Sequence, residues 1–123
     1  MRDYTKLEVF HLADAFVLMI YQITASFPLA GRSSLADQLR RAAVSIPSNI
    51  VEGCSRYTER DFLHFMDIAY ASAREAGYQL SLAQRLKFID RESALDARLL
   101  CTRVCKALAA LTISIRRGNT KPR

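Results

Sequence analysis

In this sequence of 123 residues, glycine and proline are scarce and tryptophan is missing: there are four Gly, three Pro and no Trp. With so few chain-breaking residues and no low-complexity segment, the sequence is typical of one ordered, loop-poor domain. No segment alternates apolar and polar residues, so we expect no β-strands. No apolar run is long enough to span a bilayer, and MRDYTKLEVF lacks a signal-peptide pattern, so we expect a cytoplasmic protein without a membrane segment.

Cysteine and histidine are also scarce, with three Cys and two His. An odd number of cysteines in a chain without an export signal favours reduced thiols over a disulfide framework. Cys101 and Cys105 are four residues apart and could face one another with Cys54 nearby, although three thiols without a fourth ligand favour ordinary packed thiols over a zinc site. A di-iron bundle needs inward-facing carboxylates and Glu-x-x-His pairs, and we expect His11 and His64 on the surface instead.

Motifs for catalysis are missing as well. The sequence has no glycine-rich phosphate loop, no Gly-x-Ser-x-Gly and no His-Glu-x-x-His. No histidine is placed beside a cysteine by sequence, which leaves a catalytic cysteine without support. We therefore expect no enzymatic activity, no catalytic residue, no bound metal and no cofactor.

Helices are predicted from apolar periodicity and from the residues that start and stop them. Short connections between four long helices predict an all-α, antiparallel up-and-down four-helix bundle over residues 1–117, followed by a short basic tail over 118–123. Pro47 lies inside the second helix, so we expect a kink there, at a cost of about 3 kcal/mol. The predicted helices cover about residues 7–26, 34–53, 58–86 and 90–117.

Two of these helices begin with capping signals. Thr58 and Asp61 can cap the third helix reciprocally, while Tyr57 and Phe62 have the spacing of a hydrophobic staple. The second helix opens at Ser34 with an acidic residue three positions on, which is a similar pattern. We expect both helices to start at these caps.

The second helix, QLRRAAVSIPSNIVEG over residues 38–53, has polar and apolar residues on faces outside its core face. Val44, Pro47 and Val51 form an apolar face about 130° from the core face. Polar residues repeat at seam spacing on the remaining side, which predicts a structural network against a neighbouring helix, with an ordinary solvated face as the alternative. We expect Glu75 to pair with Arg41 in this network. The seam consists of Gln38, Arg41, Ser45, Asn49 and Glu52.

The first helix is more apolar than one bundle core requires. A helix that buries a single face needs about a third of its circumference apolar, whereas this helix is apolar over more than half. The surplus predicts a homo-oligomer, and we expect its subunits to meet on Val44, Pro47 and Val51.

Positive charge is concentrated toward the C-terminus. The net charge is +6, yet residues 1–97 hold 11 basic and 12 acidic side chains, whereas residues 98–123 hold seven basic side chains and no acidic one. Clustered cations favour an anionic partner such as RNA or DNA, although cations solvated near a helix C-terminus give the same pattern. The predicted nucleic-acid-binding residues are Arg98, Arg103, Lys106, Arg116, Arg117, Lys121 and Arg123.

The run QLRRAAVSIPSNIVEG, followed by the third-helix run FLHFMDIAYASAREA, resembles the bacterial four-helix bundle proteins first noticed as open reading frames in intervening sequences of large-subunit ribosomal RNA genes. The resemblance covers about residues 7–86, with FP at 27–28 in the first loop, and the fourth helix and tail match only in character. The motif residues that match are Gln38, Arg40, Arg41, Ser45, Pro47, Asn49, Glu52 and Gly53.

The resemblance implies a bundle that assembles as a ring of five subunits, with no catalytic activity established for the family. More distant relatives, the accessory variability determinant proteins of diversity-generating retroelements, are basic rings that bind nucleic acid and a reverse transcriptase. We therefore predict a non-enzymatic homopentamer that binds nucleic acid, RNA above all, through the fourth helix and tail. The alternative is a protein-interaction scaffold whose apolar faces bind a partner protein and which has no nucleic-acid role.

Overall fold

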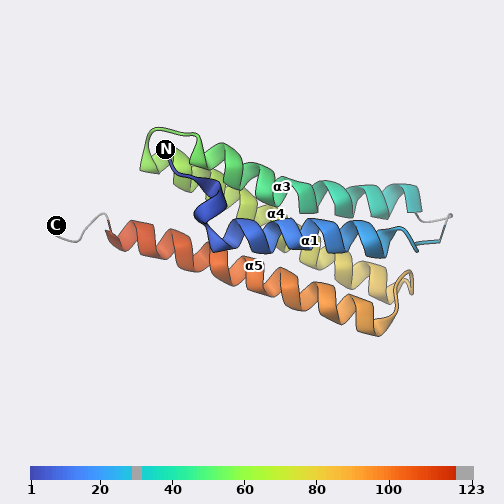
Figure 1. Ribbon diagram of the computed structural model, residues 1–123. Helices are drawn as coiled ribbons and strands as arrows, with labels where there is room; N and C mark the ends of the chain where they lie inside the picture. Colours follow the sequence, from blue (N-terminus) through green and yellow to red (C-terminus); the bar gives the residue numbers. More distant parts are fainter. Residues whose placement is uncertain (29–31, 119–123) are drawn as a thin grey trace.

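The computed structural model describes residues 1–28 and 32–118, without the side chains of residues 32 and 33. These residues form a four-helix bundle and contain no strand, as the sequence predicts. Successive long helices run in opposite directions, so α1 begins at the end of the bundle where α5 finishes (Figure 1). The elements are η1 (Tyr4–Lys6, 3₁₀), α1 (Glu8–Thr24), η2 (Arg32–Ala36, π-helical), α3 (Asp37–Cys54), α4 (Glu59–Arg85) and α5 (Arg91–Gly118).

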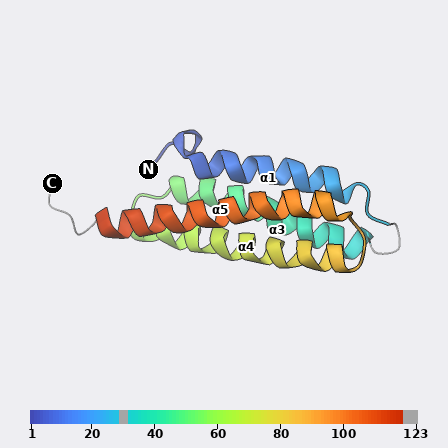
Figure 2. The ribbon, with the colours of Figure 1, turned by 90° about the horizontal axis from the view of Figure 1, so that it is seen from below.

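Each long helix packs against two others. Helix α1 contacts α3 and α5, and α4 contacts the same two helices from the other side. The view turned by 90° shows α5 lying alongside α1 and α4 (Figure 2). Burying one apolar stripe per helix stabilises this arrangement by about 25 cal/mol per Å² of apolar surface. The largest fully buried side chains are Phe16, Ile20, Leu39, Ile46, Ile50, Phe62, Met66, Leu80, Val104 and Leu108.

Side-chain caps fix the starts of α4 and α5. Thr58 Oγ1 accepts a hydrogen bond from the Asp61 backbone N–H at 3.1 Å, which confirms the Thr58 half of the predicted reciprocal cap of α4. Asp90 Oδ1 accepts from the Ser93 backbone N–H at 2.7 Å at the start of α5. Each bond satisfies a backbone donor that has no partner within the helix.

Two local predictions differ from the structure, and one short element was not predicted. The hydrophobic staple is wrong, because Tyr57 is 87% exposed and the Arg2 guanidinium, 4.1 Å from the ring centroid, covers Phe62 instead. The sequence did not predict η1. The α-helix proper of α3 begins at Asp37 after the π-helical η2, and its N-cap, Ala36, makes no side-chain capping bond.

Helix α3 passes through Pro47 without interruption, from Asp37 to Cys54. Pro47 has no N–H to donate within the helix. The kink expected at this residue stays a prediction.

The loop between α4 and α5 closes one end of the bundle. Lys87 adopts a left-handed conformation with φ of 62°, and the Phe88 N–H then bonds back to the Ala83 carbonyl at 2.9 Å. This turn directs Phe88 against Phe27, which follows α1, with 5.6 Å between the ring centroids. No helix among the described residues has the length and apolar character needed to cross a membrane.

Candidate nucleic-acid interface

Three cations of α5 lie on the flank that faces α4. Arg98 Nη1 donates to Gln84 Oε1 of α4 at 3.4 Å, and Arg116 Nη2 lies 3.4 Å from Asp67 Oδ2. Lys106 lines the groove between the two helices. The Asp67 carboxylate offsets part of the charge of Arg116, so Arg98 and Lys106 are the more available cations on this flank.

The other predicted cations are placed differently. Arg103 is exposed and lies about 140° around α5 from Arg98, at 100° per residue. Arg117 is exposed at the end of α5, where it lines a shallow hollow with Ile113. The remaining two predicted residues, Lys121 and Arg123, lie outside the described residues.

Helix α4 supplies residues that sequence reasoning did not assign to this surface. Arg74 is exposed, and its Nη1 donates to the Tyr70 hydroxyl at 3.3 Å. Tyr78 is 61% exposed, and Arg85 lies over its ring at 5.9 Å from the centroid. The spacing of four residues between Tyr70, Arg74 and Tyr78 was the available signal, because it places them on one flank of a helix.

These side chains surround a groove of about 540 Å³ between α4 and α5. Exposed cations from both helices line it together with the two tyrosines, and Gly77 lines it without a side chain. The groove is lined by Tyr70, Ala73, Arg74, Gly77, Tyr78, Ser81, Arg98, Cys101, Thr102, Cys105 and Lys106.

The outward face of α5 is less uniformly charged than its sequence predicts. Leu95, Leu99 and Ile113 are 53%, 56% and 48% exposed on this helix, among the predicted cations. Other residues of α5 occupy the core-facing positions, so these three side chains lie outside the bundle core.

Ser45 of the polar seam on α3 forms a hydrogen bond with α4. The Ser45 and Ser72 hydroxyls are 2.8 Å apart, and Asn49 Nδ2 donates to the Ser45 carbonyl at 2.8 Å and to its hydroxyl at 3.0 Å. Glu52 lies outside this network, because its carboxylate pairs with Arg56 of the same helix end at 2.7 Å.

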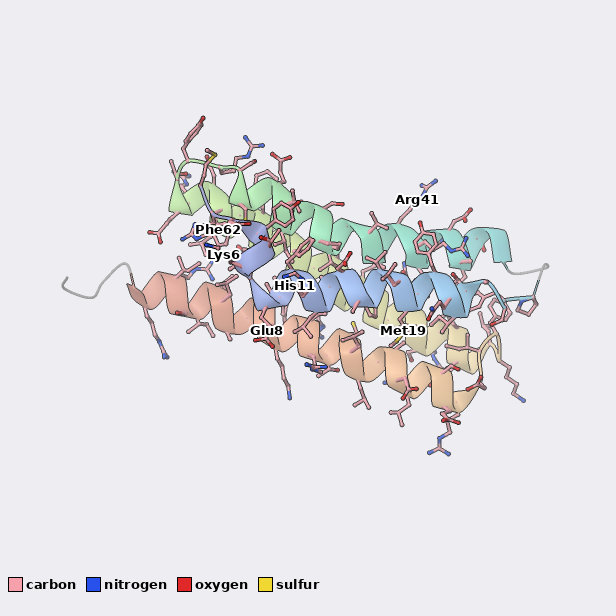
Figure 3. All side chains as sticks on the ribbon, in the orientation of Figure 1. Lys6, Glu8, His11, Met19, Arg41 and Phe62 are labelled. Atoms are coloured by element: carbon pink, nitrogen blue, oxygen red, sulfur yellow. The ribbon has the colours of Figure 1, made fainter. Side chains whose placement is uncertain are left out.

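The expected pair between Arg41 and Glu75 does not form among the described residues. Gln79 Nε2 lies 3.5 Å from Glu75 Oε2 instead. Arg41 is exposed, and its side chain extends outward from α3 (Figure 3). Gln38 is likewise exposed.

Two other motif residues of α3 make close contacts. Arg40 Nε donates to Thr24 Oγ1 at 2.8 Å, and the guanidinium lies 4.8 Å from the centre of the Tyr21 ring. Gly53 is buried against α4. The residues of the expected subunit interface lie at the surface: Val44 and Val51 are 38% and 37% exposed, and Pro47 is half-buried.

We expect Arg40→Ala to lower the free energy of unfolding by about 1.5–3 kcal/mol, because it removes a hydrogen bond from a charged donor to a fully buried hydroxyl. Thr24 Oγ1 then keeps only its bonds as a donor within α1. Arg41→Ala is the matched control, since Arg41 makes no hydrogen bond or ion pair within the described residues, and its effect should stay within about 0.5 kcal/mol. Urea unfolding followed by circular dichroism measures the free energy of unfolding of both variants. Equal losses for Arg40→Ala and Arg41→Ala would contradict a stabilising role for the Arg40–Thr24 hydrogen bond.

The histidines and Cys54 lie apart from the groove. One Glu-x-x-His spacing is present, at Glu8 and His11, but both side chains are exposed and His11 Nε2 lies 2.6 Å from the Thr5 carbonyl oxygen. His64 is also exposed. Cys54 is buried at the end of α3, next to the N-terminal segment, and within the described residues no group of three potential ligands gathers around a metal position.

The fold and this surface define an all-α bundle with a groove between α4 and α5 that is lined by cations and tyrosines. The family described as 23S rRNA-intervening sequence protein matches residues 5–110, and because the match covers most of the chain, the protein belongs to this family. The fold is similar to that of a protein of unknown function from the S23 ribosomal protein family of Bacteroides thetaiotaomicron, with a TM-score of 0.77. That match is 24% identical and covers 85% of this chain and 97% of the other. No protein with a curated description matches the sequence.

Proposed function

We propose that this protein is a non-enzymatic, cytoplasmic homo-oligomer that binds RNA along the groove between α4 and α5. The observation that carries the proposal is that Arg74, Arg98 and Lys106 line one groove with Tyr70 and Tyr78. Cations bind phosphates, and exposed aromatic rings stack on unpaired bases, which is the combination that single-stranded RNA requires.

Assembly is part of this proposal, with five subunits as the number expected. The apolar residues Tyr21, Val44 and Val51 are 46%, 38% and 37% exposed and lie on α1 and α3, on the side of the bundle away from the groove. Subunits that meet there leave each α4–α5 groove open. Several grooves on one particle would turn weak contacts with RNA into avid binding.

The test compares two double variants that each remove two positive charges. Arg98→Gln with Lys106→Gln removes cations of the groove, whereas Lys6→Gln with Lys87→Gln removes exposed cations from η1 and from the loop between α4 and α5. Fluorescence anisotropy with a labelled single-stranded RNA is measured between about 50 and 200 mM salt. We expect the groove variant to bind more weakly, with the log–log salt slope reduced by about 0.7 for each phosphate that is no longer bound, and the control variant to bind like the wild type.

A chain that ends at Ile115 tests the predicted cations of the C-terminal end separately. We expect this shortened chain to bind RNA more weakly than the wild type, because it lacks Arg116, Arg117, Lys121 and Arg123. Unchanged affinity and slope in both the groove variant and the shortened chain would contradict RNA binding by this surface.

The second candidate function is a scaffold that binds a partner protein. The exposed apolar residues Leu95 and Leu99, one turn apart on α5, favour it, since such side chains mark protein-binding surfaces when they lie together. In that case purified protein carries no nucleic acid by its ultraviolet absorbance ratio, and Leu99→Glu, rather than removal of the groove cations, abolishes partner binding.

A further inference from the structure

Two cysteine thiols lie at the base of the groove between α4 and α5. Cys101 is 4% exposed and Cys105 is partly exposed, and both line the groove beside Ala73 and Gly77 of α4. A Cβ atom at Gly77 would lie 3.5 Å from Cys101 Sγ, so the glycine leaves the space beside the thiols open. The volume of about 540 Å³ is within the range of small-molecule sites.

The two thiols are one helical turn apart and have different surroundings. Cys101 Sγ donates to the Ala73 carbonyl oxygen at 3.2 Å in the bundle interior. A hydrogen bond shared with Cys105, followed by burial, raises the pKa of Cys101, so this thiol stays protonated. Because an S–H group rotates about its Cβ–Sγ bond, the proton can turn from Ala73 toward Cys105 when Cys105 ionises.

The pKa of Cys105 is shifted in the opposite direction. The hydrogen bond from Cys101 lowers the pKa of the Cys105 thiol to about 7, with help from the charge of Arg74 and against the effect of burial. No group of α1, which also packs on α5, contributes to this shift. The titratable groups that share the groove are Tyr70, Arg74 and Tyr78 of α4 and Arg98, Cys101 and Lys106 of α5. Cys54 differs, because burial raises its pKa.

We propose that Cys105 is a site of thiol–disulfide exchange with small anionic disulfides, which the cations of the groove hold beside the thiol. Arg74, Arg98 and Lys106 are exposed and line the same groove as Cys105, so carboxylates of the ligand can pair with them while its disulfide lies over the thiols. A thiolate, rather than a thiol, is the nucleophile in this chemistry, and positive charge nearby favours it.

The exchange is balanced without any further oxidant. The Cys105 thiolate attacks one sulfur of the ligand, a new S–S bond forms to Cys105, and the ligand's own S–S bond breaks. The other half of the ligand leaves as a thiolate with the bonding electron pair and takes a proton from water. The protein thiol is oxidised and the leaving half of the ligand is reduced.

Cys101 is the positioning residue in this site. Its S–H stabilises the Cys105 thiolate, so Cys101→Ala should move the pH midpoint of Cys105 reactivity upward from about 7 toward the ordinary value of 9.0. The rate follows the thiolate fraction, which rises with pH. For wild-type Cys105 we expect about a tenfold increase between pH 6 and pH 8, whereas an ordinary thiol increases about a hundredfold over the same range.

The experiment uses three disulfide probes of different charge on the full chain. Glutathione disulfide is anionic, bis(2-hydroxyethyl) disulfide is neutral and cystamine is cationic at neutral pH. Rates are followed by mass spectrometry, divided by the rate of each probe with 2-mercaptoethanol, a reference thiol that carries no charged group, and assigned to a cysteine by peptide mapping. We expect Cys105 to react before Cys54 and Cys101, and the normalised rate to be highest for the anionic probe.

Arg74→Gln should remove most of the preference for the anionic probe, whereas Arg41→Gln, which removes the same charge from the outer side of α3, should keep it. Three results would overturn the proposal: modification that reaches Cys54 or Cys101 first, a pH profile of an ordinary thiol at Cys105, or normalised rates that do not depend on probe charge. None of these measurements involves RNA, so they are independent of the function proposed above.

Discussion

Gly53→Ala is expected to lower the free energy of unfolding by about 1–3 kcal/mol, because the added methyl group has no room between α3 and α4. A Cβ atom at Gly53 would lie 2.8 Å from Met66 Cε, 3.0 Å from Phe65 Cβ and 3.3 Å from the Phe62 carbonyl oxygen. The end of Met66 can move, although its side chain is fully buried. Phe65 Cβ and the Phe62 carbonyl are fixed to the backbone of α4, so the helices themselves would have to separate.

Helix propensity alone predicts the opposite sign for Gly53→Ala. Alanine is favoured over glycine inside a helix by about 0.8–1.0 kcal/mol, so without a clash Gly53→Ala should stabilise the protein. Gly77→Ala supplies the control, because its Cβ would meet only Cys101 Sγ, at an ordinary contact distance of 3.5 Å. We expect that variant to be neutral or stabilising by up to about 1 kcal/mol. Urea unfolding curves that shift in the same direction for both variants would contradict the close packing at Gly53.

The four helices were predictable because their signals are local. Apolar periodicity and the Thr58 cap depend only on residues a few positions apart, and the structure places both as expected. The staple at Tyr57 failed because Phe62 is covered from a distant part of the sequence: the Arg2 N–H bonds to the Cys54 carbonyl at 2.9 Å and brings its guanidinium over the Phe62 ring. A pattern of neighbouring residues gives no information about a side chain that lies more than fifty positions away in the sequence.

The groove shows the same limit. The spacing of Arg98 and Lys106 indicated that they share a flank of α5, but a helical wheel does not say which neighbour that flank faces. Only the packing of α5 on α4 places Arg74 and Tyr78 beside them. The spacing of Cys101 and Cys105 was visible in the sequence, and Cys101 is the main cause of the lowered pKa of Cys105. The smaller contribution of the Arg74 charge comes from the other helix.

The apolar residues of α1 are partly accounted for by the bundle itself. Phe16 and Ile20 are fully buried, and several others are half-buried, yet Leu18 and Tyr21 remain 62% and 46% exposed. The Arg40 guanidinium of α3 covers one side of the Tyr21 ring. The exposed edge of Tyr21 therefore lies next to the face of α3 that carries Val51. This continuity between α1 and α3 favours one shared contact surface over scattered apolar residues.

Val51→Asp is expected to dissociate the proposed homo-oligomer into monomers while the helical content stays close to that of the wild type. Val51 is already 37% exposed in the single chain, so the change leaves the bundle core intact. In an assembly on this face, each copy of the interface would bury a carboxylate without a partner, at a cost of several kcal/mol.

Leu95→Asp is the matched control on α5, where the side chain is 53% exposed. Native mass spectrometry should show five subunits for the wild type and for Leu95→Asp and single chains for Val51→Asp, with circular dichroism reporting the fold. A wild type that is monomeric would refute assembly itself, and a ring that survives Val51→Asp but not Leu95→Asp would move the interface from α3 to α5.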